Sequence, residues 1–181
     1  MSATVGRART GDDAGMSLPE VIVYAAVSAL LLSVLAGVFY VGSQTQAAVG
    51  GRDAATGAGQ VVTNSLQTSV RNASSLLVTG TLVKARVATG ALGWQCVTWA
   101  LTADNKLVYR AASAAITSTD YSTWTVLATG ARGLLGGGAA FSGGSTQVSY
   151  SLSFASGSVS VPVAGAAMAN AYGTGSPESC W

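Results

Sequence analysis

The first apolar stretch of the chain is long and uncharged. Residues 21–41, VIVYAAVSALLLSVLAGVFYV, contain no Asp, Glu, Lys or Arg. About twenty residues in an α-helix are enough to cross about 30 Å of hydrocarbon. The apolar region of an ordinary secretory signal is shorter, at about 7–15 residues. The pattern therefore predicts a membrane-spanning helix over this stretch.

The helical pattern continues beyond this stretch, with apolar residues on one side only. In 44–77, small and apolar residues recur every three or four positions, as in one stripe of a helix. We predict one long helix from about Met16 to about Ser75, apolar all round in 16–43. Glycine weakens a helix by up to ~1 kcal/mol relative to alanine, so bends or unwound turns are expected at six positions. These are Gly37, Gly42, Gly50, Gly51, Gly57 and Gly59.

Beyond residue 78 apolar and polar positions tend to alternate, which is typical of β-strands. The predicted strands are 78–87 (a strand pair or one irregular strand), 96–101, 107–111, 121–128, 148–154 and 159–163. We expect a glycine-rich loop at 130–144 and an irregular tail from residue 164. Pro162 has no backbone N–H to donate, so its strand is expected at a sheet edge.

Two of these segments predict which side chains are buried. The second and third form a hairpin about the turn at 104–105, with Val97, Trp99 and Leu101 on one face. In 148–154, VSYSLSF, the four larger residues point inward and the three serines point outward. A helix with one apolar stripe needs a sheet to cover it. The fold class is therefore α+β, a long N-terminal helix whose second half packs on an antiparallel sheet in 78–181.

Composition excludes several kinds of chemistry. The chain of 181 residues has 9% charged residues and a net charge of +2, too little to indicate nucleic-acid binding by itself. It has no histidine, so neither a Ser-His-Asp nor a Cys-His arrangement can be built. Two cysteines cannot make a zinc site, and GLLGGG at 133–138 lacks the lysine of a phosphate loop. We expect a protein that is not an enzyme, with no metal or cofactor.

Glu20 is an isolated carboxylate at the head of the apolar run. The next charged residue along the chain is Arg52. A lone carboxylate within a bilayer costs about 2.5–3.5 kcal/mol, so it needs a positive partner. If the chain were cut after Gly15, Met16 would carry a free α-amine. Met16 and Glu20 are four residues apart on one helix face, so the cut would create the missing charge.

The sequence Gly15-Met16-Ser17-Leu18-Pro19-Glu20, followed by an apolar helix, resembles the type IV prepilin signal. The resemblance implies that residues 1–15 are a leader and that a prepilin peptidase of the inner membrane cleaves after Gly15. It also implies N-methylation of Met16. Glu20 would neutralise the N-terminal amine of an adjacent subunit during assembly. The fold expected for such a chain is pilin-like, and a proline in the first helical turn is compatible with it.

The resemblance also implies partners and a location. We expect other pilin subunits, the prepilin peptidase, the pilus assembly machinery and the membrane as partners. The chain would cross the cytoplasmic membrane once before assembly and lie in a cell-surface pilus afterwards. The branch expected within this family is a minor pilin. A pseudopilin of a type II secretion machine is the nearest alternative.

Other classes of protein remain open from the sequence. A DNA-uptake tip subunit is one, although no cluster of basic and aromatic residues supports DNA as a partner. A plain single-pass anchor is another, with Glu20 as a charge that reaches the membrane interface. The third is a secreted domain whose signal is cut after Ala36.

Cys96 and Cys180 are expected to form a disulfide. Everything after the span would lie outside the cytoplasm, where disulfides persist. The bond would close a long loop, worth up to about 4–5 kcal/mol in the chain-entropy model, while two free thiols are the alternative. Trp94, Trp99 and Trp124 are expected in the core or on a sheet face rather than in a ligand site. The terminal Trp181 is expected to pack beside the disulfide.

Overall fold

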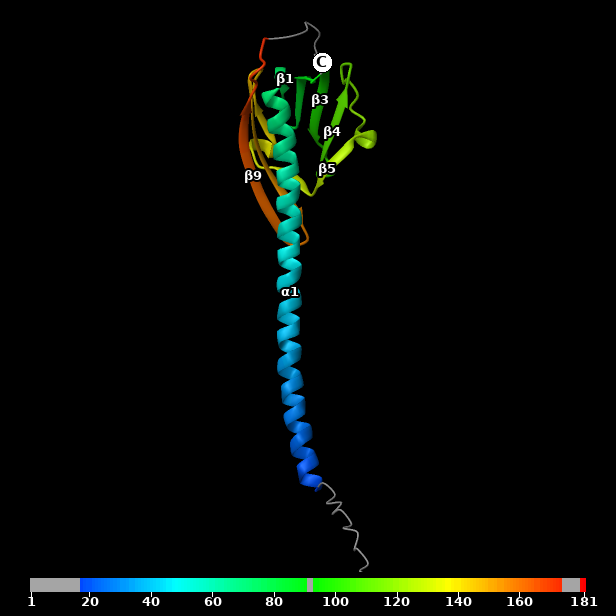
Figure 1. Cartoon of the computed structure of the whole chain (residues 1–181), viewed down its shortest axis with the longest axis vertical. Helices are drawn as coiled ribbons and strands as arrows, with labels where there is room; N and C mark the ends of the chain where they lie inside the picture. The colour runs from blue at the N-terminus through cyan, green and yellow to red at the C-terminus, as the bar shows by residue number, and fades with distance from the viewer. Residues whose placement is uncertain (1–16, 91–92, 174–179) are drawn as a thin grey trace, which may run out of the picture. The chain divides into compact units, whose positions relative to one another are not determined.

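The computed structural model describes residues 17–90, 93–173 and 180–181. One helix is followed by strands and two short 3-10 helices, which is the predicted α+β class (Figure 1). The elements are α1 (Leu18–Arg71), β1 (Ala73–Val78), β2 (Leu82–Ala88), β3 (Trp94–Leu101), β4 (Lys106–Ala112), η1 (Tyr121–Thr123), β5 (Thr125–Thr129), β6 (Ala131–Gly133), η2 (Gly136–Gly138), β7 (Phe141–Gly143), β8 (Gln147–Ser156) and β9 (Val159–Met168).

The chain divides into two compact units, Met1–Thr45 and Gln46–Trp181. The boundary falls within α1, close to the end of the predicted apolar half at residue 43. The described part of the first unit consists of Ser17 and the helix that follows it. The second unit contains the rest of α1 and all the strands.

The ends of α1 follow from local hydrogen bonds. At its start, the backbone N–H groups of Glu20 and Val21 donate to the Ser17 carbonyl at 2.9 and 3.2 Å. At its end, the Asn72 side-chain amide donates to the Thr68 carbonyl at 3.1 Å. The predicted continuation to Ser75 is wrong, because the chain turns at Asn72 and pairs with β2 as strand β1. Pairing with a neighbouring strand outweighs the local helical pattern.

The helix is continuous through all six of its glycines, so the expected unwound turns do not occur. Gly59 is buried in the second unit, where it faces β8 and β9. A Cβ atom at Gly59 would lie 2.7 Å from Val163 Cγ2 and 3.5 Å from Phe154 Cδ2. Gly59 therefore allows the helix to approach the sheet more closely than a larger residue would permit.

The first sheet has five antiparallel strands in the order β1-β2-β3-β4-β5. The predicted hairpin is confirmed as β3 and β4, and Asn105 in its turn has a positive φ of 58°. The stretch 78–87 is a strand pair, since β1 ends and β2 begins within it. The predicted strand 121–128 is only partly confirmed, because η1 occupies its first three residues before β5 starts.

The second sheet is built on β8, with β6 and β7 along one edge and β9 along the other. The alternation predicted for 148–154 is confirmed on its apolar side, where the four larger residues are buried. Two predictions about this sheet are wrong. The region 130–144 contains β6 and β7, and β9 continues through residue 164 to Met168. These strands form because their backbones pair with β8. They are rich in glycine and alanine, so their sequences show no alternation of large apolar and polar side chains that would predict a strand.

The main core lies between α1 and both sheets, rather than between α1 and a single sheet. Val62, Leu66 and Val70 of the helix are fully buried against Trp99 of β3 and Phe154 of β8. Two hydrogen bonds join the same layers in the second unit. Trp99 Nε1 donates to Ser65 Oγ at 3.0 Å, and Gln67 Nε2 donates to the Tyr150 hydroxyl at 3.2 Å.

Candidate functional site

The two residues of the predicted cleavage site, Gly15 and Met16, lie outside the described residues. The described chain begins one position later, at Ser17, and enters α1 at Leu18. The predicted peptidase cleavage and N-methylation therefore stay predictions.

Glu20 lies in the first turn of α1 and is exposed. A carboxylate at this position interacts favourably with the partial positive charge of a helix N-terminus. Among the described residues Glu20 forms no salt bridge, and the ion pair found in that part of the chain joins Lys106 to Asp104 at 3.7 Å. Glu20 is therefore a charge without a charged partner within the described chain.

The helix around Glu20 is apolar on every side. Every described residue from Ser17 to Thr45 is exposed. An 18-residue stretch of α1 has a mean hydropathy of 2.5, and none of that stretch is buried. By length and composition, this helix could cross a membrane. The large exposed apolar residues of this segment are Leu18, Val21, Ile22, Val23, Tyr24, Val27, Leu30, Leu31, Leu32, Val34, Leu35, Val38, Phe39, Tyr40 and Val41. Contiguous apolar surface of this size indicates contact with lipid or with other protein.

The part of α1 in the second unit has a different surface. Its buried residues recur at helical spacing and form the stripe that the sequence predicts. They are Ala55, Gly59, Val62, Leu66 and Val70. The opposite side of this segment is exposed and carries the second acidic residue of α1, Asp53.

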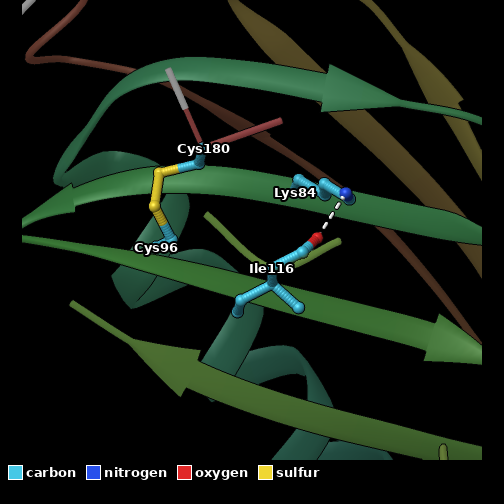
Figure 2. Close-up of a disulfide and its surroundings, with 4 residues drawn as sticks. All are labelled: Lys84, Cys96, Ile116 and Cys180. Atoms are coloured by element: carbon cyan, nitrogen blue, oxygen red, sulfur yellow. Dashed lines mark hydrogen bonds between the residues drawn. A yellow bond between two sulfur atoms is a disulfide. The ribbon is translucent and has the colours of Figure 1, made fainter. Parts of the chain in front are cut away.

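The disulfide predicted between Cys96 and Cys180 is present, with the two Cα atoms 5.4 Å apart (Figure 2). It ties the C-terminal end of the chain to β3. Both cysteines belong to a second, smaller core on the face of the first sheet that points away from α1. The other buried members of this core are Ala100, Val108, Ile116 and Trp124.

A lysine anchors the segment that covers this second core. Lys84 of β2 donates to the backbone carbonyl of Ile116 at 2.6 Å (Figure 2). Ile116 lies between β4 and β5 and is buried beside the disulfide cluster. The hydrogen bond therefore holds the β4–β5 connection against the sheet.

The tryptophans are distributed over both cores. Trp99 is in the main core next to Tyr109, with ring centroids 5.5 Å apart, and burial raises the pKa of the Tyr109 hydroxyl. Trp124 is buried in the second core and contacts Tyr121 edge to face at 5.0 Å. Trp94 lies beside Arg86, whose guanidinium carbon is 5.4 Å from the ring centroid. Sequence reasoning did not single out Arg86, because no motif marks it.

The described residues contain no group of three His, Cys, Asp or Glu side chains that could hold a metal ion. Comparisons with protein-family models, with curated proteins and with solved structures find no match. The functional argument therefore depends on the chain's own geometry. Its main features are the exposed apolar helix with Glu20 in the first turn and a disulfide-bonded unit of two sheets.

Proposed function

We propose that this chain is a subunit of a type IV pilin-like filament, in the minor-pilin branch. The observation that carries the proposal is Glu20. It is a lone carboxylate in the first turn of an exposed apolar helix, and that helix continues into a β-rich unit closed by a disulfide. An assembly role explains why an apolar surface and a charge that is costly to bury occur side by side.

The proposed mechanism is assembly of subunits through α1. A prepilin peptidase cleaves after Gly15 and methylates the new amine of Met16. The apolar half of the helix stays in the cytoplasmic membrane until subunits come together in a cell-surface pilus. Close packing of the exposed Leu and Val side chains between neighbouring helices then supplies cohesion through van der Waals contact. Pairing of Glu20 with the amine of a neighbouring subunit sets the register of the helices.

The first experiment is to determine the N-terminus of the mature protein by mass spectrometry of membrane and surface fractions. A chain that begins at Met16, with or without a methyl group, is the expected result. A chain that retains Met1 would contradict the proposal and identify a plain membrane anchor. A chain that begins at Gly37 would identify a secreted domain, in which Glu20 belongs to a discarded signal.

Replacement of Glu20 tests whether this residue is needed for filament assembly but not for folding. We expect Glu20→Ala to fold and to enter the membrane normally, since Glu20 has no partner in the described chain. Its recovery in sheared surface filaments should fall at least about tenfold, because an unpaired amine buried between helices costs several kcal/mol. The recovery is measured by immunoblotting of sheared filaments against whole membranes.

Asp53→Ala is the matched control for this variant. Asp53 is also an exposed acidic residue of α1, but it lies in the second unit. Its filament recovery should equal that of the unmodified protein. Normal incorporation of Glu20→Ala, or equal losses in both variants, would rule out the proposed role of Glu20.

A further inference from the structure

Arg86 is a buried cation on the side of the first sheet that faces away from α1. Only 6% of its surface is exposed. It lies on β2 directly opposite Cys96 of β3, which carries the disulfide. The Trp94 ring is 5.4 Å from its guanidinium carbon, a distance at which an aromatic ring attracts a cation. Arg86 is therefore buried beside the Cys96–Cys180 disulfide.

Two donors of this guanidinium are unused in the described chain. Nε and Nη1 are both buried and have no hydrogen-bond partner there. Lys84, two residues earlier on the same strand, differs because it donates to the Ile116 carbonyl. A buried charge without hydrogen bonds is strongly unfavourable, so Arg86 requires a ligand that accepts them.

The acidic side chains of the described chain are engaged or located elsewhere. Asp104 pairs with Lys106, and Asp120 accepts a hydrogen bond from the backbone N–H of Ser122 at 3.0 Å. Glu20 and Asp53 are exposed residues of α1. Strands β2, β3 and β4 contain no acidic residue. The negative charge that Arg86 needs is therefore not supplied by a described side chain.

A small cavity adjoins Arg86. Its volume is about 30 Å³, and it is lined by Arg86, Trp94, Gln95, Cys96 and residues 113–115. A site of this size holds one water-sized group, and the Gln95 amide and the Ser113 hydroxyl are neutral donors by type. The lining has one cation, two neutral polar side chains and no acid, so the chemistry favours a small anion over a cation.

We propose that Arg86 is the centre of an anion site that takes one chloride ion or one carboxylate group. The ligand accepts charge-assisted hydrogen bonds from Nε and Nη1, which are stronger than neutral ones. Trp94 holds the guanidinium in place, as aromatic faces do for arginine. The bound anion neutralises the buried charge next to the Cys96–Cys180 bond and thereby stabilises the second core.

The test is thermal unfolding of the full chain in detergent micelles, with chloride replacing gluconate at constant ionic strength. Gluconate is too large for the cavity. The unmodified protein should show a saturable rise in Tm of about 3–8 °C. Arg86→Met should lose that rise, and Arg86→Gln serves in its place if the methionine variant does not fold. Arg110→Met removes an exposed cation of the same sheet and should keep the full rise.

A second anion distinguishes the two forms of the ligand. Formate is a carboxylate small enough for a cavity of this size. If the unmodified protein ignores chloride but shows the saturable rise with formate, the ligand is a carboxylate. The site proposal is wrong if neither anion gives a rise. It is equally wrong if the response persists in Arg86→Met, because the ion then binds elsewhere.

Discussion

Asp120 shows how one side chain positions a whole connection. Its carboxylate caps η1 by accepting from the backbone N–H of Ser122. This hydrogen bond lowers the pKa of the Asp120 carboxyl. The cap comes directly before Tyr121 and Trp124, whose edge-to-face contact closes the second core. We therefore expect the order of this aromatic pair to depend on the charge of Asp120.

The sign of the pH dependence follows from the lowered pKa. The cap contributes its full stabilisation above the ordinary pKa of an aspartate, about 4, and loses it as the pH falls through the lower pKa of the folded state. We expect Asp120→Ala to disorder η1 at neutral pH and to shift the indole N–H resonance of Trp124. The same shift should appear in the unmodified protein at acidic pH. It is followed by two-dimensional NMR of the protein in micelles.

Asp104→Ala is the control for this experiment, because Asp104 is an exposed acid that pairs with exposed Lys106. It should leave the Trp124 resonance unchanged. An Asp120→Ala spectrum identical to that of the unmodified protein would show that the cap does not position the aromatic pair.

At the scale of elements, the two glycines Gly57 and Gly59 of α1 have opposite surroundings. A Cβ atom at Gly57 would meet nothing within 4 Å, whereas one at Gly59 would meet Val163 and Phe154. The helix packs on the second sheet through Gly59, so this position controls how closely the two elements approach. Gly57 has no such packing role, and its effect is to weaken the helix as any glycine does.

Gly57→Leu and Gly59→Leu form a matched pair with the same gain in helix propensity. Gly57→Leu should stabilise the protein by up to about 1 kcal/mol. Gly59→Leu should instead destabilise it by about 1–3 kcal/mol, because the added side chain overpacks the core. Chemical denaturation of both variants measures the difference. Equal effects would show that the contact between the helix and β9 is not as close as described.

Elements were predictable where side chains differ strongly from position to position. The alternation VSYSLSF specified the buried face of β8, and the turn at 104–105 specified the β3–β4 hairpin. Strands β6, β7 and the end of β9 were missed because Gly and Ala segments pair through their backbones and carry little side-chain pattern. The end of α1 was misplaced because Leu76 and Leu77 fit a helical stripe and a strand equally well.

The two candidate sites, Glu20 and Arg86, also differ in whether the sequence alone could predict them. Glu20 was visible in the sequence because it is a single charge beside a long apolar run. Arg86 was not, because its burial depends on two segments remote in sequence, the β4–β5 connection and the C-terminal end. A residue that becomes unusual only through tertiary contacts leaves no local signal.

For the whole molecule, the disulfide is a covalent link between two residues that are 84 positions apart in the sequence. Replacing both cysteines, Cys96→Ala with Cys180→Ala, should lower the free energy of unfolding by about 2–5 kcal/mol. The loss arises mainly because the unfolded chain regains the freedom of a long loop. Urea denaturation at matched pH measures it. An unchanged midpoint would mean that the second core holds the C-terminal end without the covalent bond.

The placement of α1 before every strand that covers it also determines when the protein can fold. Val62, Leu66 and Val70 are made early, but β8 and β9, which bury them from one side, end only at Met168. Contacts between such distant segments form slowly, and surfaces that wait for them are prone to aggregation. A nascent chain therefore carries an uncovered apolar stripe for most of its synthesis. Its survival until the last strand is made therefore depends on keeping that stripe from aggregating.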